Sequence, residues 1–157
     1  MQWKEFGAKG FRQVDIPIEI RLSLRQGTVY YMAERGLSST EPHYFIVLNR
    51  KPLESKILLL LVASSQVEKS LKRITRKNLP PESLVVINDT EYDDFTKESS
   101  IDCNKLFNKS LEELCEQWKK KEVRAHKDLP RELVEKLIEG VMASPMISEE
   151  DKALIDS

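Results

Sequence analysis

Two continuous apolar runs of strand length lie near the middle of the chain. The first extends from Pro42 to Leu48, and the second extends from Lys56 to Ala63 and is followed by a serine pair. A short polar connection that contains Arg50, Lys51 and Pro52 separates them. Apolar runs of this length with a short connection are typical of neighbouring strands in the core of a small barrel or sandwich. We therefore expect the two segments to pair at the centre of one closed sheet.

Four further segments have strand patterns. Residues 15–24 alternate isoleucine or leucine with polar residues, which indicates a half-buried strand, and Pro17 near its start favours an edge position. Residues 28–33 are rich in β-branched and aromatic side chains. Residues 83–88 form another short apolar run, and residues 97–104 are expected to form the last strand.

Helical spacing follows the second core run and returns in the last third of the chain. Ser65 and Glu68 have the S-x-x-E form of a capping box, and so do Ser110 and Glu113. The exposed face of the first predicted helix is basic. The expected helices cover residues 66–77, the residues after Ser110, the apolar stripe from Leu133 to Met142 and a short stretch around residues 153–155.

Composition indicates one globular domain. The chain has 157 residues, of which 40% are hydrophobic and 32% are charged, so it is long enough to bury a core. No apolar run reaches the roughly 18 residues that cross a bilayer, and we expect a cytoplasmic protein without membrane contact. Two cysteines and two histidines are too few for a disulfide framework or a zinc site, so we expect no metal and no cofactor.

The expected organisation has three parts within a single domain. Residues 1–14 form an N-terminal arm, either docked or frayed, residues 15–104 form the β region with one inserted helix, and residues 105–157 form a helical C-terminal third. The formal net charge is −1, which argues against a surface that is basic throughout and leaves room for a local basic patch.

The order of these segments resembles the MazF/PemK-like toxin family. The similarity spans about Gly27 to Ala143 and is carried by short motifs. The matching segments are Gly27-Thr28-Val29-Tyr30, Pro42 to Leu48, Ala63-Ser64-Ser65, the strand around Val85, and Lys97 to Asp102. The resemblance implies a small SH3-like β-barrel that acts as a metal-independent endoribonuclease on single-stranded RNA. It also implies a homodimer that a cognate antitoxin protein neutralises.

One residue departs from the family pattern. The family has Arg-Pro before its second strand, and here Pro42 is kept while Glu41 stands in place of the arginine. Metal-free RNA cleavage needs a base for the 2′-hydroxyl, an acid for the leaving oxygen and a cation for the crowded phosphate. Glu41 supplies no positive charge. The sequence therefore leaves open an inactive barrel that binds a protein or a nucleic acid.

The resemblance assigns candidate roles to residues of this chain. Ser64 or Ser65 matches the Thr or Ser that ends the third strand in the family. His43, two residues after Glu41, is the candidate acid or base in place of the missing arginine, because an imidazole titrates near neutral pH. Cations that we expect to hold phosphate or RNA are Arg35, Arg50, Lys51, Lys69 and Arg73.

Each candidate also has a structural interpretation. His43 can be a hydrogen-bonded structural residue, Ser65 can be a helix N-cap, and the basic helix face can simply be solvated. The acidic loop at 89–94 is interpreted as solvated, and His126 as a surface residue.

Overall fold

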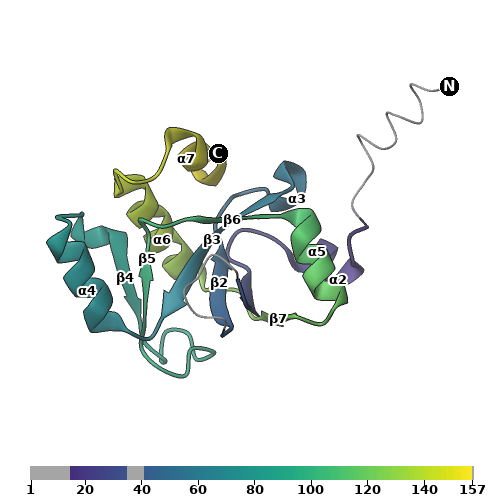
Figure 1. The fold of residues 1–157 in the computed structure, drawn as a ribbon, viewed down its shortest axis with the longest axis horizontal. Coiled ribbons are helices and arrows are strands. Elements are labelled where there is room, and N and C mark those ends of the chain that lie inside the picture. Colours follow the sequence, from purple (N-terminus) through teal and green to yellow (C-terminus); the bar gives the residue numbers. More distant parts are fainter. Residues whose placement is uncertain (1–14, 35–40, 157) are drawn as a thin grey trace.

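A single antiparallel sheet runs through the described parts of the chain, which are residues 15–34 and 41–156 of this computed structural model (Figure 1). Its strands are β1 (Val29–Met32), β2 (His43–Val47), β3 (Ile57–Ser64), β4 (Leu84–Ile87), β5 (Ser99–Asp102), β6 (Phe107–Ser110) and β7 (Val123–His126). They follow the spatial order β4-β5-β3-β2-β1-β7, and β6 pairs with the first half of β3. Pairing between the described strands leaves β4 and β7 unjoined. The predicted α+β class is therefore confirmed, and closure into a barrel is not.

Helices cover both faces and both ends of this sheet. In Figure 1, α4 lies beside β4 at one end of the molecule, and α5 and α2 lie at the other end. The helices are α2 (Ile18–Ser23), α3 (Pro52–Ser55), α4 (Val67–Arg76), α5 (Leu111–Lys119), α6 (Arg131–Ala143) and α7 (Glu149–Asp156), with a 3₁₀ turn η1 (Pro81–Ser83). Each helix in the described ranges falls short of the length and apolarity that crossing a membrane requires.

The two central strands are buried on both faces, as their continuous apolar runs predict. Alternate residues of β3 enter two separate core clusters, with Leu59 and Leu61 in one and Leu58 and Leu60 in the other. All four side chains are fully buried. The first cluster is completed by α6, and the second by α2 and α5. Because both faces are covered, the strand needs no polar side and reads as an uninterrupted apolar segment.

Residues 15–24 form a helix, so the predicted edge strand is wrong. Helix α2 covers Ile18–Ser23, and Pro17 precedes it as the N-cap. Ile20 and Leu24 are buried, four residues apart on one helical face, whereas Ile18 and Leu22 are exposed. The period of two in the sequence is therefore not the period of burial. Only one apolar residue in two faces the core.

The sequence predicted a wholly helical C-terminal third, and this prediction is wrong. Strands β6 and β7 lie within residues 105–157, on either side of α5, and pair with β3 and β1 respectively. Their sequences, Phe107–Ser110 and Val123–His126, are short and largely polar. Pairing with distant apolar strands makes them strands, because β structure depends on cross-strand packing more than on local propensity.

The remaining predicted elements are confirmed. Strands β1, β2, β3, β4 and β5 and helices α4, α5, α6 and α7 fall on the expected segments. The capping box at Ser110 is formed, since its hydroxyl accepts a 3.0 Å hydrogen bond from the Glu113 backbone N–H. The predicted N-terminal arm, residues 1–14, lies outside the described residues.

Candidate functional site

Three polar side chains lie in one row across neighbouring strands. Strands β2 and β3 are antiparallel, with Phe45 opposite Val62, so the same register continued by two residues sets His43 opposite Ser64. Ser64 is in turn paired with Ser100 of β5. The row therefore joins the start of β2 to the end of β3 and the middle of β5. Sequence reasoning placed His43 and Ser64 at one end of the sheet, and the strand pairing agrees.

The row is held by local hydrogen bonds. His43 is half-buried, and its Nδ1 lies 2.9 Å from the backbone carbonyl oxygen of Glu41. The Ser64 hydroxyl accepts a 3.1 Å hydrogen bond from the Gln66 backbone N–H. The Ser100 hydroxyl lies 3.5 Å from the Ser64 carbonyl oxygen. Among the described residues, no hydrogen bond joins His43 directly to a serine of the row.

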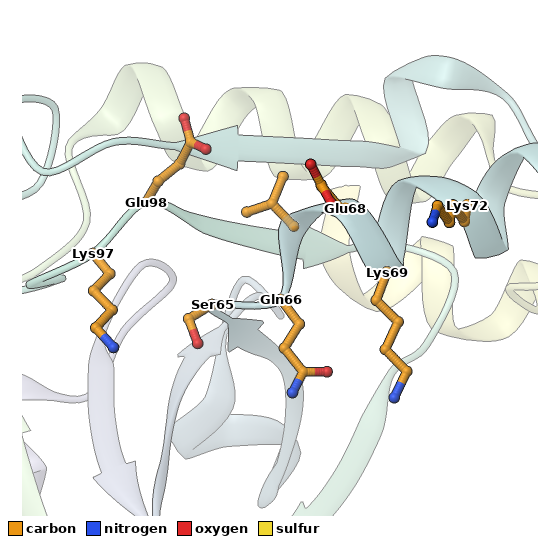
Figure 2. A pocket seen from close by; sticks show the side chains of 8 residues that line it. Ser65, Gln66, Glu68, Lys69, Lys72, Lys97 and Glu98 are labelled. Atoms are coloured by element: carbon orange, nitrogen blue, oxygen red, sulfur yellow. The ribbon is translucent and has the colours of Figure 1, made fainter.

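A wide, open depression of about 690 Å³ lies next to this row (Figure 2). It is built from the turn between β3 and α4, the first turns of α4 and the two residues that precede β5. Its lining residues are Ser65, Gln66, Val67, Glu68, Lys69, Lys72, Lys97 and Glu98. In Figure 2, Ser65, Lys69 and Lys97 extend to one side of the depression, whereas Glu68 and Glu98 extend to the other. The charges are thus separated.

The first turn of α4 favours an anion in this depression. The N-cap residue is Gln66, and no side chain caps the helix, so the predicted N-cap role of Ser65 is wrong. Uncapped N–H groups and the helix dipole both attract negative charge. Together with Lys69 and Lys97, they make this side of the depression suitable for a phosphate group, and Lys72 on the next turn of α4 also lines the depression. We call the set His43, Ser64, Ser65, Lys69, Lys72 and Lys97 the rim.

Arg50 and Lys51 do not belong to the rim. They follow β2, at the end opposite to its first residue, His43. The Arg50 backbone N–H donates to the Leu154 carbonyl, and Lys51 lies 3.8 Å from Glu54. An antiparallel pair puts its connection and its free ends at opposite edges of a sheet, separated here by the full length of β2. The predicted grouping of these two cations with His43 is therefore wrong.

The other two predicted cations differ from each other in their surroundings. Arg73 is largely buried and forms a 3.2 Å ion pair with Asp102 of β5, so its charge is already used within the fold. A role for it in holding phosphate is not supported by this arrangement. Arg35 lies outside the described residues.

The two cysteines are poor nucleophiles. Cys103 and Cys115 are both buried and reduced. Burial raises the pKa of each thiol, and most strongly that of Cys103, so the reactive thiolate is disfavoured. Within residues 15–34 and 41–156, no group of three or more histidine, cysteine or acidic side chains could hold a metal ion.

The prediction that His126 is a surface residue is wrong, whereas Asp89, Glu91 and Asp93 of the acidic loop are exposed, as expected. His126 on β7 is largely buried, and its Nδ1 lies 3.1 Å from a carboxylate oxygen of Asp94. Its Nε2 has no hydrogen-bond partner among the described residues. Tyr92 and Phe95 anchor the same loop, since both are buried and the Tyr92 hydroxyl donates a 2.6 Å bond to the Lys127 carbonyl. The aromatic residues Tyr92 and Phe95, within and directly after the acidic loop, were the sequence signal that this segment packs against the core.

Comparisons with known proteins add no identification. No protein-family model matches the chain, and no curated protein matches it.

Proposed function

We propose that this protein binds single-stranded RNA at the rim and cleaves it without a metal ion, as a divergent MazF/PemK-like toxin. The observation that carries the proposal is the pairing of β2 with β3, which brings His43 and Ser64 to one end of the sheet beside the depression lined by Lys69 and Lys97. An acid–base group, a hydroxyl and a set of cations then share one edge, which is the minimum that metal-free phosphate chemistry requires.

The proposed reaction assigns one task to each part of the rim. His43 takes the proton of the ribose 2′-hydroxyl, whose oxygen attacks the adjacent phosphorus while the bond to the 5′-oxygen breaks. The products are a 2′,3′-cyclic phosphate and a free 5′-hydroxyl, which receives a proton from water or from the protonated imidazole. Lys69, Lys97 and the free N–H groups of α4 hold the phosphate. Ser64 and Ser65 supply hydrogen bonds to its oxygens.

The proposal includes the fold and partners that the family has. We propose that the antiparallel path β4-β5-β3-β2-β1-β7 corresponds to an SH3-like barrel that is open between β4 and β7. A homodimer and a cognate antitoxin are part of the same proposal, together with a cytoplasmic location.

The competing proposal is an inactive member of the same layout that binds RNA or a protein. Glu41 in place of the family arginine favours it, as does the hydrogen bond between the His43 ring and the Glu41 carbonyl, which occupies one ring nitrogen. In that case the cations of the rim bind the ligand and no bond is broken.

Cleavage of a labelled single-stranded RNA in excess chelator distinguishes the two. We expect the wild-type protein to cut, His43→Ala to lose about a hundredfold or more in rate because an acid–base group is lost, and Lys69→Gln with Lys72→Gln to weaken RNA binding. Arg50→Gln with Lys51→Gln is the matched control, because it removes two cations from the opposite end of β2.

Three outcomes decide between the proposals. Cutting by wild type that His43→Ala leaves unchanged removes His43 from the mechanism. RNA binding without cutting supports the inactive module. Equal loss of binding in the Arg50/Lys51 control and in the Lys69/Lys72 variant would show that the effect is one of total charge and would refute the rim. Expression with and without a neighbouring antitoxin gene, with growth as the readout, tests the toxin role.

A further inference from the structure

A second surface, on the other face of the same strands, carries aromatic rings. Tyr31 of β1, Tyr44 of β2 and His126 of β7 are each partly buried side chains on three adjacent strands. The ring centroids of Tyr31 and Tyr44 lie 4.7 Å apart, and that of His126 lies 5.0 Å from Tyr44 and 6.2 Å from Tyr31. We call these three residues, together with Arg124, the aromatic platform.

The platform is held by the loop that contains Asp94 and Phe95. Phe95 is buried and packs on Tyr44 at a centroid distance of 5.1 Å. Asp94 holds the His126 ring through its Nδ1. The rings are therefore ordered before any ligand arrives, and a rigid aromatic surface loses little conformational entropy on binding.

A cation stands next to the rings. Arg124 is exposed, lies opposite Tyr31 in the β1–β7 pairing and precedes His126 by two residues, so it belongs to the same sheet face. In the described part of the chain no ion pair involves its guanidinium. A ligand that pairs a flat ring with a nearby negative charge matches this combination. A nucleotide is such a ligand, because every base has a face that stacks and an adjoining phosphate.

The two surfaces meet within one strand. His43 and Tyr44 are consecutive residues of β2, so their side chains point to opposite faces of the sheet at the same end. A single-stranded RNA that crosses this end of β2 can place one phosphate at the rim and a base a few nucleotides away on the platform.

We infer that the aromatic platform is a stacking site for a base of single-stranded RNA, with Arg124 holding a neighbouring phosphate. This inference rests on the proposed RNA function, which it deepens by locating base contacts on the face opposite to His43. Stacking tolerates any base, so the platform contributes affinity and position more than sequence preference.

The test compares a base-bearing ligand with a base-free one. The probes are a fluorescein-labelled decanucleotide with 2′-O-methyl ribose, which cannot be cut by 2′-hydroxyl attack, and an abasic strand with the same phosphates. Tyr31→Leu with Tyr44→Leu removes the rings and keeps apolar volume, whereas Tyr31→Phe with Tyr44→Phe is the matched control. We expect wild type and the Phe variant to prefer the base-bearing strand by at least about fivefold, the low end of a stacking effect. The Leu variant should lose that preference.

The outcomes separate this inference from the proposed function. A preference that survives in the Leu variant places the stacking elsewhere and overturns the platform. Equal binding of both strands by wild type, with RNA cleavage intact, overturns the platform and leaves the rim standing. Binding of neither strand refutes both. Binding of a proline-rich peptide instead of either strand would reassign the platform to protein recognition.

A second measurement covers a Leu variant that does not fold. Titration of the wild-type protein with uridine 5′-monophosphate, followed by NMR of the tyrosine ring protons, should shift Tyr31 and Tyr44 first. Arg124→Gln should weaken binding of the mononucleotide by a few fold, as the loss of one phosphate contact does. Shifts confined to residues around Ser65 and Lys69 would overturn the platform.

Discussion

The two ends of the β2–β3 pair are built in opposite ways. At the end that contains the connection, Asn49 is buried and its side chain binds the Ile57 carbonyl and the Leu59 N–H. Helix α7 closes over this end, since Arg50 donates to the Leu154 carbonyl. At the rim, Ser65, Lys69 and Lys97 are exposed around an open depression.

The difference separates stability from binding. Polar groups at the closed end have partners within the fold, so they hold strands in register and have no capacity left for a ligand. Polar groups at the rim are oriented by strands but remain accessible, which is the usual arrangement of a site on a rigid scaffold. Substitutions at the closed end should therefore cost stability, and substitutions at the rim should cost binding.

The largest expected effect comes from an ion pair in the interior between β6 and the end of β1. Lys109 is almost fully buried, and its Nζ lies 2.9 Å from Glu34, two residues beyond the strand β1. Gln117 of α5 also accepts a hydrogen bond from it. Lys109→Ala should lower the free energy of unfolding by about 3 kcal/mol, because the partly buried Glu34 carboxylate loses the cation of Lys109 and Gln117 loses a donor.

Denaturant unfolding measures this effect, with Lys119→Ala as the control. Lys119 forms an exposed ion pair with Asp15 at 2.9 Å. Its loss should change stability by less than about 1 kcal/mol, as exposed pairs do. Similar costs for the two lysines would mean that Lys109 is hydrated in solution.

The closed end gives the next largest effect. Asn49→Ala removes hydrogen bonds of 2.7 Å to the Ile57 carbonyl and 3.0 Å from the Leu59 N–H. The Ile57 carbonyl keeps the Ser55 hydroxyl as a donor, whereas the buried Leu59 N–H loses its side-chain acceptor. We expect a loss of about 2 to 3 kcal/mol in the free energy of unfolding. Asn108→Ala, on an exposed position of β6, is the matched control. RNA binding at the rim should be unchanged in a folded Asn49 variant, and a selective loss of binding would contradict the separation of the two ends.

Alkaline pH tests how well the covered interior excludes water. Burial raises the pKa of Tyr30 to about 12, above its ordinary value of 10.0. Between these two values the folded protein keeps a proton that the unfolded chain releases, so stability falls as pH rises through this window. Tyr30→Phe should remove about 1 kcal/mol of this fall between pH 9 and pH 11. Unfolding in denaturant at pH 9 and pH 11 gives the difference, and equal alkaline losses in both proteins would show that Tyr30 titrates normally.

The smallest effect is expected at the exposed cations of the closed end. Arg50→Gln with Lys51→Gln removes a side-chain contact of 3.5 Å from Arg50 to the Asp156 carbonyl and an exposed pair of Lys51 with Glu54. Stability should change by less than about 1 kcal/mol. RNA affinity, measured for both proteins at the same salt concentration, should stay within about twofold of wild type. A larger fall in affinity would place RNA at this end and sharply weaken the proposal for the rim.

Much of the fold was predictable because local patterns and tertiary burial agree. The apolar run that became β3 admits few alternatives, and the capping box at Ser110 fixes the start of α5 by a contact three residues away. Residues 15–24 show the opposite case. Their alternation suits a strand, but burial of only Ile20 and Leu24 selects a helix.

The candidate site divides in the same way. The sequence predicted that His43 and Ser64 end neighbouring strands, since that follows from two adjacent apolar runs and a short connection. It also grouped Arg50 with them, because nearness along the chain was taken for nearness in space. The pairing of His126 with Asp94, 32 residues apart, had no local signal at all.

The sequence by itself determined the paired core strands, most of the helices and the polar residues that end β2 and β3, because these depend on contacts between residues close along the chain. Only the tertiary structure decided that β6 and β7 are strands, that Arg73 is held by Asp102 and that Tyr31, Tyr44 and His126 share one face. Those outcomes depend on which distant segments pair, and the energy of pairing is set by surfaces that exist only after the chain has folded.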